Sequence, residues 1–192
     1  FLPHGEDIFK KVSETILDPV KYWRDYADDN LILLNNGSGI FIDESARAPQ
    51  FVHTGLSGRA LIWGDIDNDG DLDLVVTSCG GPARIYRNDW PKSGHWLQVR
   101  ALDPRWHRDA YGAEISVTAG GRTLTRWIAP QSSYLASNDL RAHFGLGLVV
   151  RYEQLAIRWP DGLVEEFGGG EVDRMLVLER GTGRPVTQKG EQ

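Results

Sequence analysis

The sequence predicts an all-β protein, and three observations indicate this fold class. Segments such as "HWLQVRAL", "ARIYRN" and "RMLVLER" alternate apolar and polar residues with the period of two that is typical of strands. Turn residues are dense and the segments between them are short, as in β-sheet proteins. Helical patterning is weak, and residues 6–28 form the one stretch that favours a helix.

Three pairs of strand-like segments surround strong turn signals and predict hairpins. Residues 31–43 place Asn-Gly-Ser-Gly between two apolar runs, and Asn and Gly tolerate a positive φ. Residues 114–128 place Ala-Gly-Gly between two alternating segments. Residues 155–167 contain Trp-Pro-Asp-Gly, in which the proline fixes φ and the glycine relaxes the turn.

Size and charge exclude several classes of protein. The chain has 192 residues, of which 41% are hydrophobic and 25% charged, as in an ordinary globular protein. Its 21 basic and 27 acidic residues give a formal charge of −6, which argues against nucleic acid as a partner. No apolar run approaches the ~20 residues of a membrane span. The start lacks an export signal and a methionine, so we expect a processed product or a piece of a longer protein.

The segment "GDIDNDGDLDLVV" holds five aspartates whose like charges repel unless a cation or solvent relieves the repulsion. Calcium takes six to eight oxygen ligands, and a glycine at position six of such a loop permits a sharp turn. Numbered from Asp65, the glycine is Gly70, but Val76 stands where an EF-hand has its last glutamate. The sequence therefore predicts a Ca²⁺ site rather than a solvated acidic turn, and magnesium fits less well. The expected ligands are Asp65, Asp67, Asp69, Asp73 and the carbonyl of Asp71.

Two longer segments resemble known families. "GDIDNDGDLDLVVTSCGGPARIYRND" resembles an FG-GAP/VCBS repeat, the calcium-looped blade unit of integrin-like β-propellers. "GHWLQVRAL", "DAYGAEISVTAGGRTLTRWI", "SSYLASNDLRAHFGLG" and "LAIRWPDGLVEEF" resemble the UnbV/ASPIC domain. Together they resemble the C-terminal part of the cartilage acidic protein (CRTAC) family. The resemblance implies a secreted or cell-surface, calcium-binding, non-enzymatic adhesion module, with the same five aspartates as metal ligands.

The predicted organisation follows from this resemblance and from a seam of Pro, Ser and Gly at residues 88–96. We expect a partial β-propeller of about one and a half FG-GAP/VCBS blades, followed by a β-sandwich-like UnbV/ASPIC domain. The expected parts are an irregular N-terminal segment with a short helix at residues 1–29, the repeat at 30–90, the UnbV/ASPIC domain at 94–181 and a flexible polar tail at 182–192.

The small number of blades has a consequence for partners. The blade at residues 58–88 shows three strands, and repeat architectures need several units to bury their faces. Unpaired strand edges recruit other strands. We therefore expect other protein chains as partners, either further copies of this chain, as an oligomer or filament, or the remainder of a parent propeller.

Other candidate sites are weaker. Asn36 begins an Asn-Gly-Ser glycosylation sequon at a hairpin tip, for which a simple turn is the alternative. The single cysteine, Cys79, is interpreted as a buried hydrophobe. Trp90, Trp96 and Trp106 lie near the seam and could stack on sugar rings. An accessory carbohydrate-binding region of a larger secreted enzyme is therefore the alternative function. No nucleophile–base or acid–base pair stands out, so we expect no enzyme activity.

Overall fold

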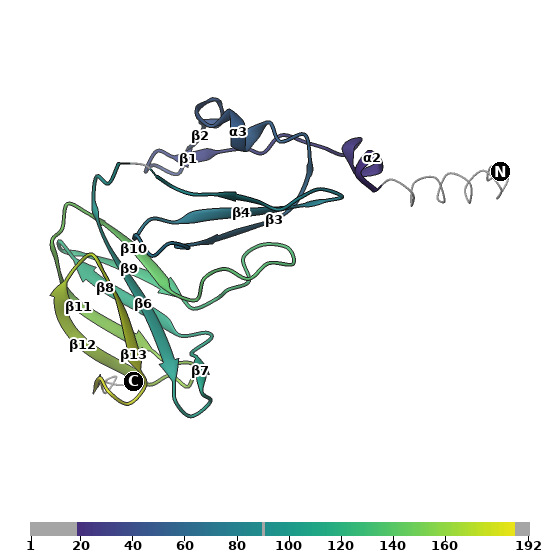
Figure 1. Ribbon diagram of the computed structural model, residues 1–192. Helices are drawn as coiled ribbons and strands as arrows, with labels where there is room; N and C mark the ends of the chain where they lie inside the picture. Colours follow the sequence, from purple (N-terminus) through teal and green to yellow (C-terminus); the bar gives the residue numbers. More distant parts are fainter. Residues whose placement is uncertain (1–18, 90, 187–192) are drawn as a thin grey trace. The chain divides into compact units, whose positions relative to one another are not determined.

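The computed structural model describes residues 19–89 and 91–186 (Figure 1). The described chain forms two compact units that interleave along the sequence. The first unit consists of residues 19–62, 74–86 and 133–135, and the second of residues 63–73, 87–132 and 136–186. In the described ranges, no helix has both the length and the apolar character needed to cross a bilayer.

The first unit begins with a short helix and a hairpin. Helix α2 (Pro19–Arg24) falls within the stretch predicted to be helical, and residues 6–18 of that stretch lie outside the described residues. Strands β1 (Leu33–Asn35) and β2 (Phe41–Asp43) pair antiparallel, which confirms the predicted hairpin. A 3₁₀ turn, η1 (Ser45–Arg47), and a one-turn helix, α3 (Pro49–Val52), follow. The pattern of apolar residues did not predict these two short elements.

A three-stranded sheet completes the first unit. Its order is β3 (Ser57–Gly64), β4 (Asp73–Cys79) and β5 (Arg84–Tyr86). The three strands expected between residues 58 and 88 are thus present. The nine residues that begin at Asp65, which join β3 to β4 and include the first residue of β4, contain the predicted calcium ligands and are called the aspartate loop below.

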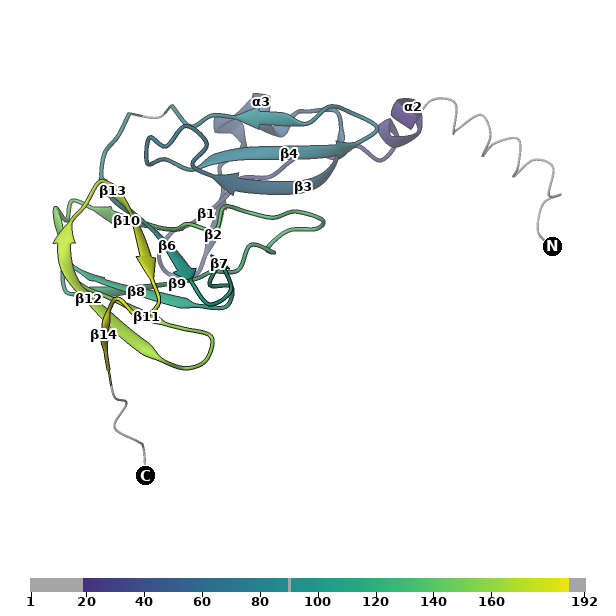
Figure 2. The ribbon, with the colours of Figure 1, turned by 60° about the horizontal axis from the view of Figure 1, so that its bottom comes forward.

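The second unit contains two β-sheets, which Figure 2 shows as two layers. The first sheet has the order β10 (Ala142–Gly147), β6 (His95–Asp103) and β13 (Arg174–Glu179), with β7 (Arg108–Asp109) also paired to β6. The second has the order β14 (Arg184–Pro185), β12 (Val164–Glu171), β11 (Arg151–Arg158), β8 (Glu114–Ala119) and β9 (Arg122–Trp127). The all-β, β-sandwich-like prediction is confirmed. Of the predicted tail, β14 is ordered, and residues 187–192 lie outside the described residues.

The core of the second unit follows from strand alternation. Every second residue of β6 points inward, and Leu97, Val99 and Ala101 are fully buried. Phe144 of β10 and Trp159 join the same apolar cluster. The opposite face of β6 and β10 therefore carries the residues in between, and this outer face positions the candidate site.

Candidate metal centre

The aspartate loop is ordered by its own carboxylates. Asp65 accepts hydrogen bonds from the backbone N–H groups of Asp69, at 3.0 Å, and Gly70, at 2.9 Å. Asp69 in turn accepts a hydrogen bond from the N–H of Asp71 at 2.9 Å. These short-range contacts form the tight turns that Asp residues favour, because the side chain replaces a backbone acceptor.

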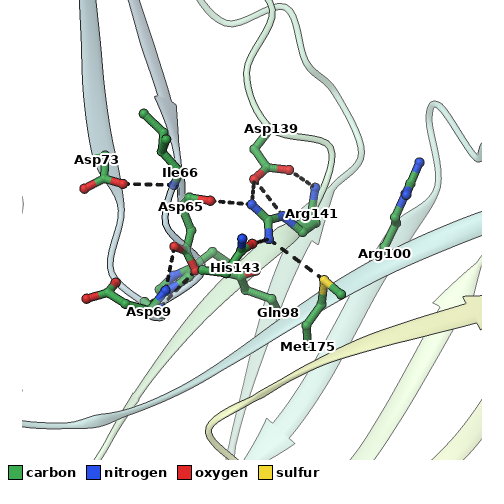
Figure 3. A network of polar contacts seen from close by, with 12 residues as sticks. Asp65, Ile66, Asp69, Asp73, Gln98, Arg100, Asp139, Arg141, His143 and Met175 are labelled. Atoms are coloured by element: carbon green, nitrogen blue, oxygen red, sulfur yellow. Dashed lines mark hydrogen bonds and ion pairs between the residues drawn. The ribbon is translucent and has the colours of Figure 1, made fainter. Parts of the chain in front are cut away.

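Asp73 closes the loop from its other end. Its two carboxylate oxygens accept hydrogen bonds from the N–H groups of Ile66, at 2.9 Å, and Asn88, at 2.8 Å (Figure 3 draws the first). Asp65 and Asp73 are each only 2% exposed. Backbone N–H groups thus donate hydrogen bonds to both buried carboxylates, but these donors carry no net charge.

Three loop carboxylates converge at a distance that fits one cation. Asp65, Asp67 and Asp73 each offer one oxygen, and these oxygens lie within 4.8 Å of one another. Two oxygens on opposite sides of a calcium ion are about 4.6–5.2 Å apart, since each Ca–O distance is about 2.3–2.6 Å. The donor set is therefore compatible with a calcium ion. Asp69 and Asp71, the other two predicted ligands, lie outside this group of three.

Asp69 lies beside a lysine side chain. The Nζ of Lys92 lies 3.6 Å from Asp69 Oδ2, and it also donates to the Asp69 carbonyl. The hydrogen bond from the Asp71 N–H is the main cause that lowers the pKa of Asp69, and the charge of Lys92 lowers it further.

The outer face of β6 and β10 supports the loop. Strand register pairs Gln98 with His143 and Trp96 with Gly145, so these side chains share one face. Gln98 donates from Nε2 to Asp65 Oδ2 at 2.5 Å. His143 Nε2 lies 2.8 Å from the Gly70 carbonyl.

Trp96 explains why the sixth loop position requires glycine. Gly70 has a φ of +97°, in the region that L-residues with side chains rarely adopt. A Cβ atom built on Gly70 would lie 2.0 Å from Cε2 of Trp96. Backbone conformation and close packing thus both exclude a side chain here.

Arg141 links the loop to Asp139, in the segment that precedes β10 (Figure 3). Its guanidinium donates to the Asp65 carbonyl at 2.6 Å and to Asn68 Oδ1 at 2.5 Å. On its other side it forms an ion pair with Asp139, at 2.5 Å. The hydrogen bond to Asp139 is the main cause that raises the pKa of Arg141, and burial opposes the increase.

The segment "SNDLRAH" therefore has a structural partner that sequence reasoning missed. Asn138 Oδ1 accepts a hydrogen bond from the Trp63 N–H at 3.1 Å, and the Asp139 N–H donates to the Trp63 carbonyl at 3.2 Å. Together with Arg141 and His143, these contacts place the segment directly against the aspartate loop. No signal in one sequence links two motifs that are about 70 residues apart, because spacing along the chain does not reveal proximity in space.

The other residues singled out in the sequence lie in separate places. Asn36 lies exposed in the turn between β1 and β2, where its Oδ1 accepts hydrogen bonds from the N–H and hydroxyl groups of Ser38. Cys79 is half-buried at the end of β4. Of the three seam tryptophans, Trp106 is 65% exposed, Trp96 contacts Gly70 and Trp90 lies outside the described residues.

Comparisons with known proteins support the resemblance. Residues 103–185 match the family model described as ASPIC and UnbV. The chain is 33% identical to cartilage acidic protein 1 of Mus musculus over 126 residues, or 64% of this chain. It is 29% identical to the Homo sapiens protein over 63% of this chain, and 31% identical to the Xenopus tropicalis protein over 58%. The matches cover 19%, 19% and 18% of these relatives, so the chain spans about a fifth of their length.

These matches confirm the predicted likeness to the UnbV/ASPIC-containing part of a CRTAC-like protein. The FG-GAP/VCBS assignment of residues 30–90 stays a prediction, and so do the predicted domain limits.

Proposed function

We propose that the chain is a calcium-binding structural module, because residues 103–185 match the ASPIC and UnbV family model and the chain resembles cartilage acidic protein 1. In this proposal the parent protein is secreted or displayed at the cell surface and acts in adhesion or assembly without catalysis. One observation carries the proposal: the oxygens of Asp65, Asp67 and Asp73 lie within 4.8 Å of one another. Asp69 and the Asp71 carbonyl complete the proposed ligand set.

Thermal unfolding with and without a chelator tests the metal. A ligand that binds only the folded state adds about 2.7 kcal/mol at 100 times its Kd. For a chain of this size we therefore expect chelation to lower the melting temperature by about 5–10 °C. Asp69→Ala should remove most of this sensitivity. Asp89→Ala, which changes an exposed aspartate outside the loop, is the matched control and should keep it. An unchanged melting curve in excess chelator would contradict the proposal.

Exposed apolar residues support the proposed assembly with other chains. Successive residues of a strand point to opposite faces. Leu33 and Leu34 of β1 are 50% and 49% exposed, and Phe41 and Ile42 of β2 are 61% and 49% exposed. Both faces of this hairpin are thus open, which is the surface that another blade or another copy would cover. Light scattering on the purified chain measures its mass against that of a 21.5 kDa monomer.

A further inference from the structure

We infer that Arg141 and Gln98 are positioning residues that set the calcium affinity of the aspartate loop. The inference rests on the proposed calcium function and deepens it. It makes the loop and the outer face of β6 and β10 one metal-binding unit, with the ligands on one part and their supports on the other.

Arg141 holds the loop at two places, one on its backbone and one on a side chain. Its guanidinium reaches the Asp65 carbonyl and the Asn68 side chain at 2.6 Å and 2.5 Å, while Asp139 fixes its orientation through Nε at 2.7 Å. The side chain is only 16% exposed. A planar guanidinium can bridge three acceptors in fixed directions, which a lysine ammonium cannot reproduce. Arg141 thus fixes the position of the first ligand residue, Asp65, and of Asn68 within the loop.

Gln98 is an independent indication that the outer face is built for the loop. Its side chain is 1% exposed and donates to Asp65 Oδ2, while its Oε1 is buried without a hydrogen-bond partner among the described residues. An unpaired buried acceptor is unfavourable for folding. An apolar residue would suit this position better if it served only the stability of the sheet. The hydrogen bond that orients Asp65 explains why this position has the amide side chain of Gln98.

Orientation matters because the loop collects like charges. The ligand carboxylates repel one another before the ion binds, so an unsupported loop would spread and lose the converging geometry. Contacts that fix the ligands beforehand reduce the ordering that binding requires. Loss of groups that orient metal ligands typically weakens metal affinity by about 10–100-fold.

Calcium titration of the full chain, followed by calorimetry, tests the role of Arg141. Arg141→Lys keeps the charge and removes the bridging geometry, and we expect its calcium Kd to rise about 10–100-fold. Arg100→Lys is the matched control. Strand alternation places Arg100 on the same face of β6 as Gln98. Arg100 pairs with Asp109 at 2.7 Å and 3.0 Å and lies apart from the loop (Figure 3). Its calcium Kd should equal that of the wild type.

The variant Gln98→Met tests whether Gln98 positions Asp65 or only stabilises the sheet. Methionine fills a similar volume without a buried polar atom, so the metal-free variant should melt at or above the wild-type temperature. Its calcium affinity should nevertheless fall, because Asp65 loses the donor that orients it. A residue with a structural role alone would not move these two quantities in opposite directions.

The outcomes distinguish calcium binding by the chain from the roles of Arg141 and Gln98. A wild-type chain that binds no calcium would overturn the proposed function and this inference together. A wild-type chain that binds calcium, with unchanged affinity in both Arg141→Lys and Gln98→Met, would overturn the inference alone. If Arg141→Lys does not fold, the affinity of Gln98→Met decides the matter.

Discussion

The second unit contains two groups of carboxylates that differ in how their charge is balanced. Asp103 and Asp161 lie beside two arginines: Arg105 reaches them at 2.6 Å and 3.2 Å, and Arg180 reaches Asp161 at 2.5 Å. In the aspartate loop, backbone N–H groups and one glutamine donate most of the hydrogen bonds. Within the described ranges, Asp69 is the one loop aspartate in an ion pair.

A hydrogen bond and a counter-charge therefore have different effects on a carboxylate. An N–H donor satisfies a carboxylate oxygen but leaves its negative charge in place, whereas a guanidinium does both. In the arginine-paired group, the guanidinium groups balance the negative charge of both carboxylates. The aspartate loop is ordered yet keeps a surplus of negative charge, which is the property that a divalent cation would neutralise.

The largest expected effect contrasts the glycines of the two regions. Gly70 has a φ of +97° and packs against Trp96, whereas Gly162, beside Asp161, has a φ of +87° and no atom within 4 Å of a built Cβ. Gly162→Ala should therefore cost only the conformational penalty, about 1–2 kcal/mol. Gly70→Ala adds overpacking, for a total of about 2–5 kcal/mol. Urea unfolding measures both; equal losses would show that Trp96 does not constrain the loop.

Much of the fold could be predicted from the sequence, because the information is local. Gly120 and Gly121 both adopt positive φ at the turn between β8 and β9, as their place between two alternating segments indicated. The parallel pairing of β13 with β6 could not be predicted in this way. Alternation identifies a strand and its two faces but carries no information about its neighbour or direction.

The local features of the candidate site could also be predicted from the sequence, and its long-range contacts could not. The ligand spacing and the glycine at the sixth position are local, and the sequence indicated both. The supports are distant in sequence: Gln98 lies 33 residues from Asp65, and Arg141 lies 76 residues away. The sequence allows Trp96 to stack on sugar rings, and only the fold shows that its ring lies against Gly70.

An effect of intermediate size is expected for the stability of the fold at low pH, through the ion pair of Asp103 with Arg105. Hydrogen bonds from the Arg105 side chain are the main cause that lowers the pKa of Asp103, whose side chain is 6% exposed. A lowered pKa in the folded state stabilises the fold above the unfolded pKa of about 3.9. This contribution is lost as the pH falls through the folded value.

Arg105→Gln tests this dependence. The variant should be less stable than the wild type at neutral pH, and the difference should shrink below about pH 4 as Asp103 becomes protonated. Urea unfolding at a series of pH values measures the two curves. Curves that stay parallel down to about pH 2 would show that Asp103 gains nothing from Arg105.

The smallest expected effect concerns Lys92, which forms an ion pair with an aspartate of the loop. Lys92 Nζ lies 3.6 Å from Asp69 Oδ2, and its positive charge repels an incoming calcium ion. Both side chains are partly exposed, so solvent and salt screen this repulsion and limit it to about 0.2–1 kcal/mol. Lys92→Gln should therefore tighten calcium binding by only about 1.4- to 5-fold, a gain that should decline as salt increases. Lys92→Arg keeps the charge and should bind calcium as the wild type does. Weaker binding by Lys92→Gln would instead show that Lys92 helps to hold the Asp69 carbonyl in place, so that it supports the loop in the same way as Arg141.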